Sequence, residues 1–109
     1  MANRFKNANF DLTTTDVTDI YTVPAESRAI VQNIHAANVS AGNTEIKAFI
    51  YDDSASRAYQ FAEHTVNSGD SRSMSDGPVI LEENDKLQLS AAAGNVFEGT
   101  VSILEFDRT

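Results

Sequence analysis

The two histidines are the side chains most suited to act as a catalytic base near neutral pH. A hydrolytic triad could be written by combining His35 or His64 with one of several serines and aspartates. No nucleophile-elbow sequence surrounds any serine, however, and with this many Ser and Asp the letters coincide by chance. We therefore expect no enzymatic activity. His35 is expected to be a half-buried packing residue or an interface group, and His64 a side chain on a sheet surface.

Metal binding is supported no better. The histidines are 29 positions apart and form no His-x-His pair, and the chain has no cysteine to supply a thiolate. Acidic turns at 52–53 and 82–85 offer the oxygen ligands that calcium prefers, so a weak calcium site stays open. Solvated acidic turns are the favoured interpretation, and we expect no metal and no cofactor.

Carbohydrate binding is the alternative class of function. Tyr51 and Tyr59 flank one predicted hairpin and could stack together on a sugar, although cross-strand packing is the simpler interpretation. The chain has no Trp, and its six Phe are more often core residues than a sugar platform. A carbohydrate-binding β-sandwich module therefore remains a secondary hypothesis.

The charge balance excludes other partners. Eight Lys or Arg against 16 Asp or Glu give a net charge of -8, which repels nucleic acid phosphates. The longest apolar stretches have four residues, far short of the roughly 20 that cross a bilayer. We expect no nucleic acid and no membrane partner, and the first residues lack the apolar core of a signal peptide.

The N-terminus is basic, unlike the rest of the chain. Arg4 and Lys6 are the only charges in the first ten residues, and Phe5 and Phe10 lie beside them. We interpret residues 1–12 as an N-terminal arm or edge strand, and 13–109 as the sandwich domain. As an arm, Arg4, Phe5, Lys6 and Phe10 would bind a neighbouring acidic subunit of a capsid, and residues 1–10 could be removed without loss of the fold.

Alternation of apolar and polar residues, with period two, predicts strands throughout the chain. The clearest is 86–91, where Leu87, Leu89 and Ala91 face inward. A helix over 54–63 is the less favoured alternative for part of one strand, and Gly99 is expected to mark a bulge or a bend. The predicted strands are 4–12, 18–23, 29–39, 44–51, 57–66, 78–81, 86–91 and 96–106.

Turn-forming clusters separate these segments, as in sandwiches and barrels. We predict an all-β chain that forms a single antiparallel, jelly-roll-like β-sandwich of seven to nine strands. Apolar residues left on outward faces are candidates for contacts between subunits, or equally for the second face of the sandwich. They are Phe49, Tyr51, Phe97, Leu104 and Phe106.

Two sequence motifs support a family resemblance. The first is TVPAESRAIV at 22–31 with IHAAN at 34–38, and the second is PVILEENDKLQL at 78–89, followed by a closing strand at 100–105. Together they resemble small all-β structural proteins of tailed bacteriophage virions, of the capsid decoration or cement type. Glu26 and Asn84 stand where relatives often carry glycine. Because Glu tolerates a left-handed conformation poorly, the turn after Pro24 is expected to differ from that of the family.

The resemblance implies a structural role at the capsid surface of the virion. Such a protein is made in the host cytoplasm and stabilises the head by binding the major capsid protein or other virion proteins. It also implies a homo-oligomer, with a trimer favoured. A ring or adaptor protein of the neck or tail is the alternative within the same class.

Overall fold

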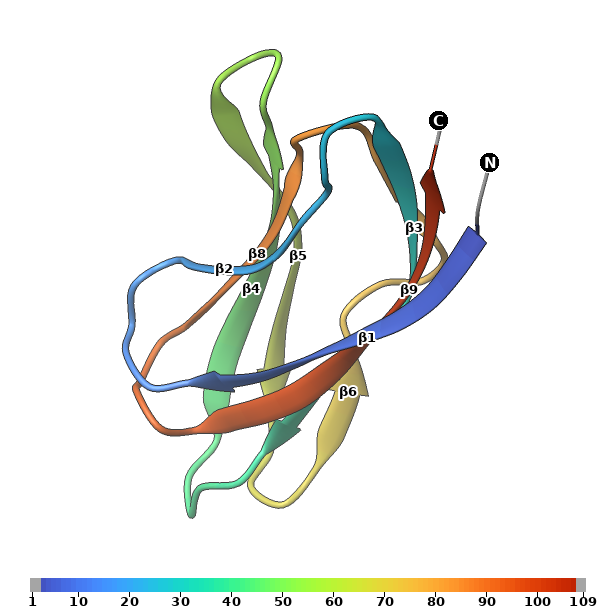
Figure 1. The fold of residues 1–109 in the computed structure, drawn as a ribbon. Coiled ribbons are helices and arrows are strands. Elements are labelled where there is room, and N and C mark those ends of the chain that lie inside the picture. The colour runs from blue at the N-terminus through green and yellow to red at the C-terminus, as the bar shows by residue number, and fades with distance from the viewer. Residues whose placement is uncertain (1–2, 108–109) are drawn as a thin grey trace.

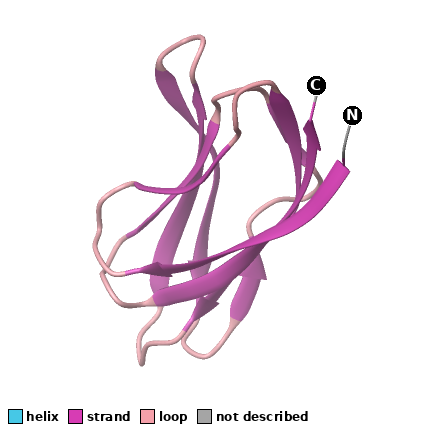
Figure 2. Cartoon of the chain, in the orientation of Figure 1, coloured by secondary structure: helices cyan, strands magenta, loops and turns pink. Residues whose placement is uncertain are grey.

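The computed structural model describes residues 3–107, which form two antiparallel sheets packed face to face (Figures 1 and 2). Sheet A has the order β1-β9-β3, with β6 and β7 both paired to the far side of β3. Sheet B has the order β2-β8-β4-β5. The strands of sheet A are β1 (Asn3–Leu12), β3 (Ser27–Asn38), β6 (Ser71–Ser73), β7 (Val79–Leu81) and β9 (Phe97–Asp107), and those of sheet B are β2 (Thr18–Thr22), β4 (Thr44–Asp52), β5 (Arg57–Val66) and β8 (Lys86–Ala91).

The strand order confirms the predicted fold class. Because β6 and β7 pair with different parts of β3, they act as one interrupted strand, and each sheet then has four strand positions. The resulting orders, 1-9-3-6/7 and 2-8-4-5, are those of a jelly roll built from two Greek keys. Residues 54–63, for which a helix was the alternative, are a turn followed by β5. The described residues include no helix with the length and apolarity to span a bilayer.

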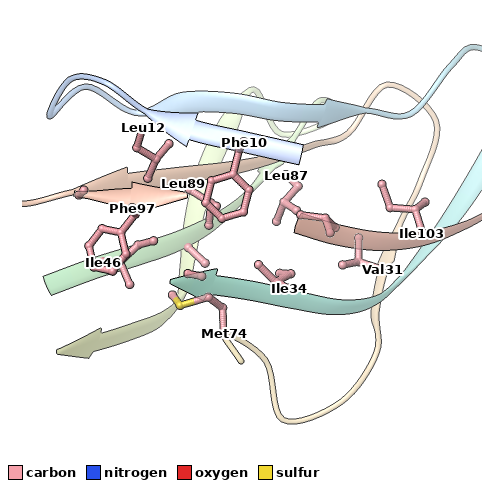
Figure 3. Close-up of a cluster of buried hydrophobic side chains, with 14 of the residues drawn as sticks. Phe10, Leu12, Val31, Ile34, Ile46, Met74, Leu87, Leu89, Phe97 and Ile103 are labelled. Atoms are coloured by element: carbon pink, nitrogen blue, oxygen red, sulfur yellow. The ribbon is translucent and has the colours of Figure 1, made fainter. Parts of the chain in front are cut away.

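Inward-facing side chains of both sheets form one core (Figure 3). On β8 the residues predicted to face inward, Leu87, Leu89 and Ala91, are buried. Phe97 of β9 and Ile46 of β4 come from opposite sheets and are both fully buried. This two-layer burial is the main source of stability, since each sheet hides the apolar face of the other.

Gly99 marks a close approach of strands and not the bulge that we expected. The register of β9 with both neighbours is continuous at Gly99, and the irregularity lies in β3, between Val31 and Asn33. Phe10 is the direct partner of Gly99 on β1. A Cβ atom at Gly99 would lie 2.0 Å from the backbone oxygen of His35 and 2.5 Å from the Phe10 ring. The missing side chain thus makes room for the Phe10 ring.

The two motifs that carry the family resemblance bind each other. Val23 N–H donates to the Asp85 carbonyl at 3.0 Å, and Asn84 N–H donates to the Val23 carbonyl at 3.1 Å. Glu26 N–H donates to the Glu83 carboxylate. Glu26 and Asn84 have φ of 61° and 67°, so both residues adopt the left-handed conformation that favours glycine. Glu26 therefore keeps the glycine-like conformation, contrary to our expectation.

Candidate functional site

An apolar row crosses the outer face of sheet A. Strand register places Phe5 of β1 opposite Leu104 of β9, Leu104 opposite Ile30 of β3, and Ile30 opposite Ile80 of β7. Directly paired residues point to the same face of a sheet. Because Ile103 and Glu105 point into the sandwich, Leu104 and its partners point away from it.

Phe106 extends this row into a patch, since it lies on the same face of β9, two residues after Leu104. We call Phe5, Ile30, Ile80, Leu104 and Phe106 the sheet A patch. Phe5 is 79% exposed and Ile80 is 69% exposed, whereas the other three are half-buried. Contiguous exposed apolar residues of this kind mark interaction surfaces more often than isolated ones do.

The rest of the same face is polar. The next row pairs Asn7, Ser102 and Asn33, and the row after it pairs Asn9, Thr100 and His35. His35 is exposed there, and its Nδ1 lies 3.4 Å from the side-chain nitrogen of Asn33. The apolar residues of this face are therefore confined to the end that carries Phe5 and Ile80.

A buried carboxylate anchors β1 behind the patch. The Glu105 side chain is 2% exposed and points into the sandwich from β9. The Tyr21 hydroxyl of β2 donates a hydrogen bond to it at 2.5 Å. From β1, Lys6 Nζ lies 3.1 Å from one carboxylate oxygen, and an Arg4 guanidinium nitrogen lies 3.8 Å from the other. We call these four residues the Glu105 clamp, which joins β1, β9 and a strand of the opposite sheet.

The clamp shifts the titration of both of its acidic groups. Burial alone would raise the pKa of Glu105, but the hydrogen bonds from Tyr21 and Lys6 and the charges of Lys6 and Arg4 outweigh it, so the pKa lies below its usual value. Burial raises the pKa of Tyr21, and its hydrogen bond to the Glu105 carboxylate raises it further. At neutral pH the clamp therefore holds an ionised Glu105 and a neutral Tyr21.

Residues 3–12 form β1, so the basic residues of the predicted arm have partners within their own subunit. Arg4 and Lys6 bind Glu105 of the same chain, and Phe5 between them points outward into the sheet A patch. Phe10 is only 8% exposed and belongs to the core. Its place in the predicted capsid contact is therefore wrong, and its burial argues against the expectation that residues 1–10 are dispensable for folding.

The residues predicted for subunit contacts fall into three places. Leu104 and Phe106 lie in the sheet A patch, whereas Phe49 and Tyr51 are half-buried on the outer face of sheet B. Phe97 is fully buried and cannot be a contact residue. It shares the parity of Val101 and Ile103 along β9, so its side chain points into the core. The prediction missed Ile30 and Ile80. Alternation along their strands could have placed both on an outward face, because the adjacent Ala29 and Leu81 face the core.

Polar side chains surround the aromatic residues on the outer face of sheet B. Lys86 Nζ lies 5.5 Å from the centre of the Tyr51 ring and 3.3 Å from Asp19, which also accepts a hydrogen bond from Gln88 at 2.7 Å. Tyr51 is paired with Ala58, whereas Tyr59 is paired with Ile50, the preceding residue on β4. Tyr51 and Tyr59 therefore point to opposite faces of the sheet and do not form the sugar platform that was considered.

The acidic turns have a structural role. The Asp85 carboxylate is buried and accepts hydrogen bonds from the backbone N–H of Asp53 at 3.1 Å and of Glu82 at 3.0 Å. It thereby connects the β4–β5 hairpin with the β7–β8 turn. Within residues 3–107, no group of three or more His, Asp or Glu is placed to hold a metal ion.

Comparison with known proteins identifies the fold. No protein-family model and no curated protein matches the chain. A solved capsid structure of the Helicobacter pylori bacteriophage KHP30 is similar over 100% of this chain and 90% of its own, with TM-score 0.61 and 11% identity. The T13 viral particle of IBDV is similar over 96% of this chain and 31% of its own, with TM-score 0.62 and 8% identity.

A bacterial assembly has the same architecture. Disulfide-linked pili that form Bacillus endospore appendages are similar over 99% of this chain and 88% of their own, with TM-score 0.57 and 8% identity. At these identities the likeness concerns the fold alone. The chain has the jelly-roll fold that is found in viral capsids and in a bacterial surface fibre.

Proposed function

We propose that this protein is a structural component of a virion, a decoration or cement protein that binds the capsid surface through the sheet A patch. It is made in the host cytoplasm, acts without catalysis, and assembles as a trimer on the major capsid protein. The sheet A patch carries this proposal, because its exposed apolar side chains gather at one end of an otherwise polar face. The capsid neighbours share the fold, which supports a role in assembly.

Contact through a face is favoured because the sheet edges are protected against strand addition. On β1, Arg4 and Lys6 point inward, and inward-pointing charges on an edge strand oppose pairing with another chain. The pairing of β2 with β8 and that of β5 with β4 each contain a register shift. Strands β6 and β7 have three residues each, too few for extensive pairing.

Face contacts of this kind would stabilise a shell by mass action. A standard interface buries about 800 Å² on each partner, which is a large share of one side of so small a domain. Binding to the assembled shell at one hundred times the dissociation constant adds about 2.7 kcal/mol of stability per site. A trimer multiplies the effect, because its second and third contacts form at high effective concentration.

A binding assay with shells that lack this protein tests the proposal. Replacing the two most exposed patch residues, in the double variant F5S/I80S, should weaken binding about 100-fold, because a few large apolar side chains supply most of the binding energy of an interface. The matched control is V17S/V39S, which alters residues that are 51% and 56% exposed outside the patch. The control should bind within about threefold of the natural protein. Equal binding by the two double variants would refute the proposal.

Copy number separates the proposal from its nearest alternative. A decoration protein that covers the shell should be present in hundreds of copies per virion, whereas a neck or tail ring should be present in few. Quantitative mass spectrometry of purified virions measures this number. A count near one dozen would favour the neck or tail protein.

A further inference from the structure

A hollow of about 520 Å³ opens between the two sheets, on the side away from β1. Residues 61–64 of β5 form one wall, and residues 74–79, which join β6 to β7, form the other. Met74 is fully buried at the hollow, and Phe61, Ala62 and Val79 pack against the core beside it. The floor of the hollow is therefore apolar.

The rim of the hollow carries the carboxylate of Asp76, and neither Lys nor Arg is among the lining residues. Glu63 also lines the hollow, but its side chain points to the outer face of sheet B, where Lys47 Nζ lies 3.9 Å from its carboxylate. The Ser75 hydroxyl also lines the hollow, is inaccessible to solvent, and has no hydrogen-bond partner within residues 3–107. A buried polar group without a partner is unfavourable, so a group that could hydrogen-bond to Ser75 would be preferred in the hollow. These features fit an aromatic or aliphatic side chain accompanied by a basic one.

The chain itself exposes such a pair of side chains. The hairpin between β4 and β5 projects beyond the sandwich (Figure 1). Near its tip Tyr59 is 44% exposed, and the Arg57 guanidinium lies 4.6 Å from the centre of its ring. This stacking holds the cation beside the aromatic ring, and Arg57 makes no ion pair within the described residues.

We propose that Tyr59 and Arg57 of one subunit occupy the hollow of a second copy of this chain. The Tyr59 ring would cover Met74 and Phe61, while Arg57 would lie beside the acidic side chain of Asp76. The occupant and the hollow are complementary in charge and in polarity, whereas an acidic or purely polar partner would be repelled or would leave the floor exposed.

The position of the two surfaces on β5 constrains the assembly. Residues 57–59, which include the inserted side chains, and residues 61–64, which line the hollow, are neighbours on β5. If the first surface of one subunit contacts the second surface of the next, β5 of every subunit lies close to the symmetry axis. Such a contact closes into a ring when the rotation between successive subunits is one turn divided by a whole number. This inference rests on the homo-oligomer in the proposed function, for which it supplies the contact between subunits.

Sedimentation velocity of charge variants tests the contact. R57E and D76R should each weaken trimer formation about tenfold, because each places like charges together. The double variant R57E/D76R should recover assembly to within about threefold of the natural protein, since the attraction is restored with its sign reversed. R72E, which reverses an exposed arginine on β6, is the matched control and should assemble normally.

Three results would overturn the inference: a monomer at all concentrations, single variants that assemble normally, or a double variant no better than the singles. Circular dichroism confirms that each variant is folded. Shell binding by F5S/I80S is a separate measurement that tests the proposed function. If the natural protein binds shells through the sheet A patch but the R57E variant assembles normally, the proposed contact between subunits would be refuted and the proposed function would stand.

Discussion

The two halves of β1 face the same sandwich with opposite chemistry. In residues 8–12 the inward side chains are Ala8, Phe10 and Leu12, and the last two are buried in the core. In residues 3–7 the inward side chains are Arg4 and Lys6, which both bind the buried carboxylate of Glu105. One half is thus held by apolar packing, and the other by ion pairs near the surface.

This difference shows how one strand can stabilise the fold and also present an apolar side chain on the outer face. Phe5 lies between Arg4 and Lys6, so the Glu105 clamp on the inner side of β1 fixes the residue that is presented on the outer side. Packing in the other half holds the strand in register with β9. A basic, aromatic N-terminus can therefore be part of the sandwich and still present an exposed apolar residue.

Truncation should separate the two halves with the largest effect. Deleting residues 1–10 removes Phe10 from the core and leaves most of β9 without its outer neighbour, so we expect no cooperatively folded monomer. Deleting residues 1–6 removes only the clamped half and should leave a folded protein that is about 2 kcal/mol less stable. Urea denaturation followed by circular dichroism measures both. Equal stability of the two truncations would show that the halves are equivalent.

The packed half also depends on the space above Gly99. In G99A the new methyl group would meet the backbone of β3 and the Phe10 ring, so we expect a loss of about 3 kcal/mol. Thermal unfolding measures it. G77A is the matched control, because a Cβ atom at Gly77 has no heavy atom within 4 Å. A G99A variant as stable as G77A would mean that Phe10 does not fix the position of β1.

The clamped half should respond to pH. The folded-state pKa of Glu105 lies below its ordinary value of 4.5, so the clamp stabilises the fold above that pH and loses its effect as the pH falls through the folded-state pKa. E105Q should cost about 2 kcal/mol at pH 7, because Tyr21 and Lys6 lose a charged acceptor. The difference between the two proteins should shrink between pH 5 and pH 3.

Asp19 provides the control for this experiment. Its pKa is also lowered, chiefly by the hydrogen bond from Gln88, but it lies on the exposed outer face of sheet B. D19N should therefore cost less than E105Q at pH 7, within about 1 kcal/mol of the natural protein. Urea titrations at several pH values give both differences. A gap between the natural protein and E105Q that stays constant with pH would contradict an ionic clamp.

Alternation along the chain was sufficient to predict the sandwich but not every element in it. Eight of the nine strands correspond to predicted segments, because their apolar residues alternate with polar ones or, in β7, form a short apolar run between turns. Strand β6 was missed, since Ser71–Ser73 contains no apolar residue and is defined only by its pairing with β3.

The sheet A patch was predicted only in part, because it depends on pairing between distant strands. Leu104 and Phe106 could be placed on an outward face from β9 alone. Their alignment with Phe5 and Ile80 follows from the register of three other strands, which local sequence does not encode. Glu105 was a sequence signal that the prediction did not use. It continues the alternating inward series of Val101 and Ile103 on β9, yet it is acidic at a position where an apolar residue is expected.

The mutual binding of the two resemblance motifs bears on how such sequences should be compared. Backbone hydrogen bonds join Val23 to Asp85 and Asn84, so the motifs form one corner of the sandwich, whatever its outer faces bind. A sequence search guided by these motifs would collect proteins that fold this corner alike, whatever their task. Grouping those proteins by task would require the residues that align across sheet A.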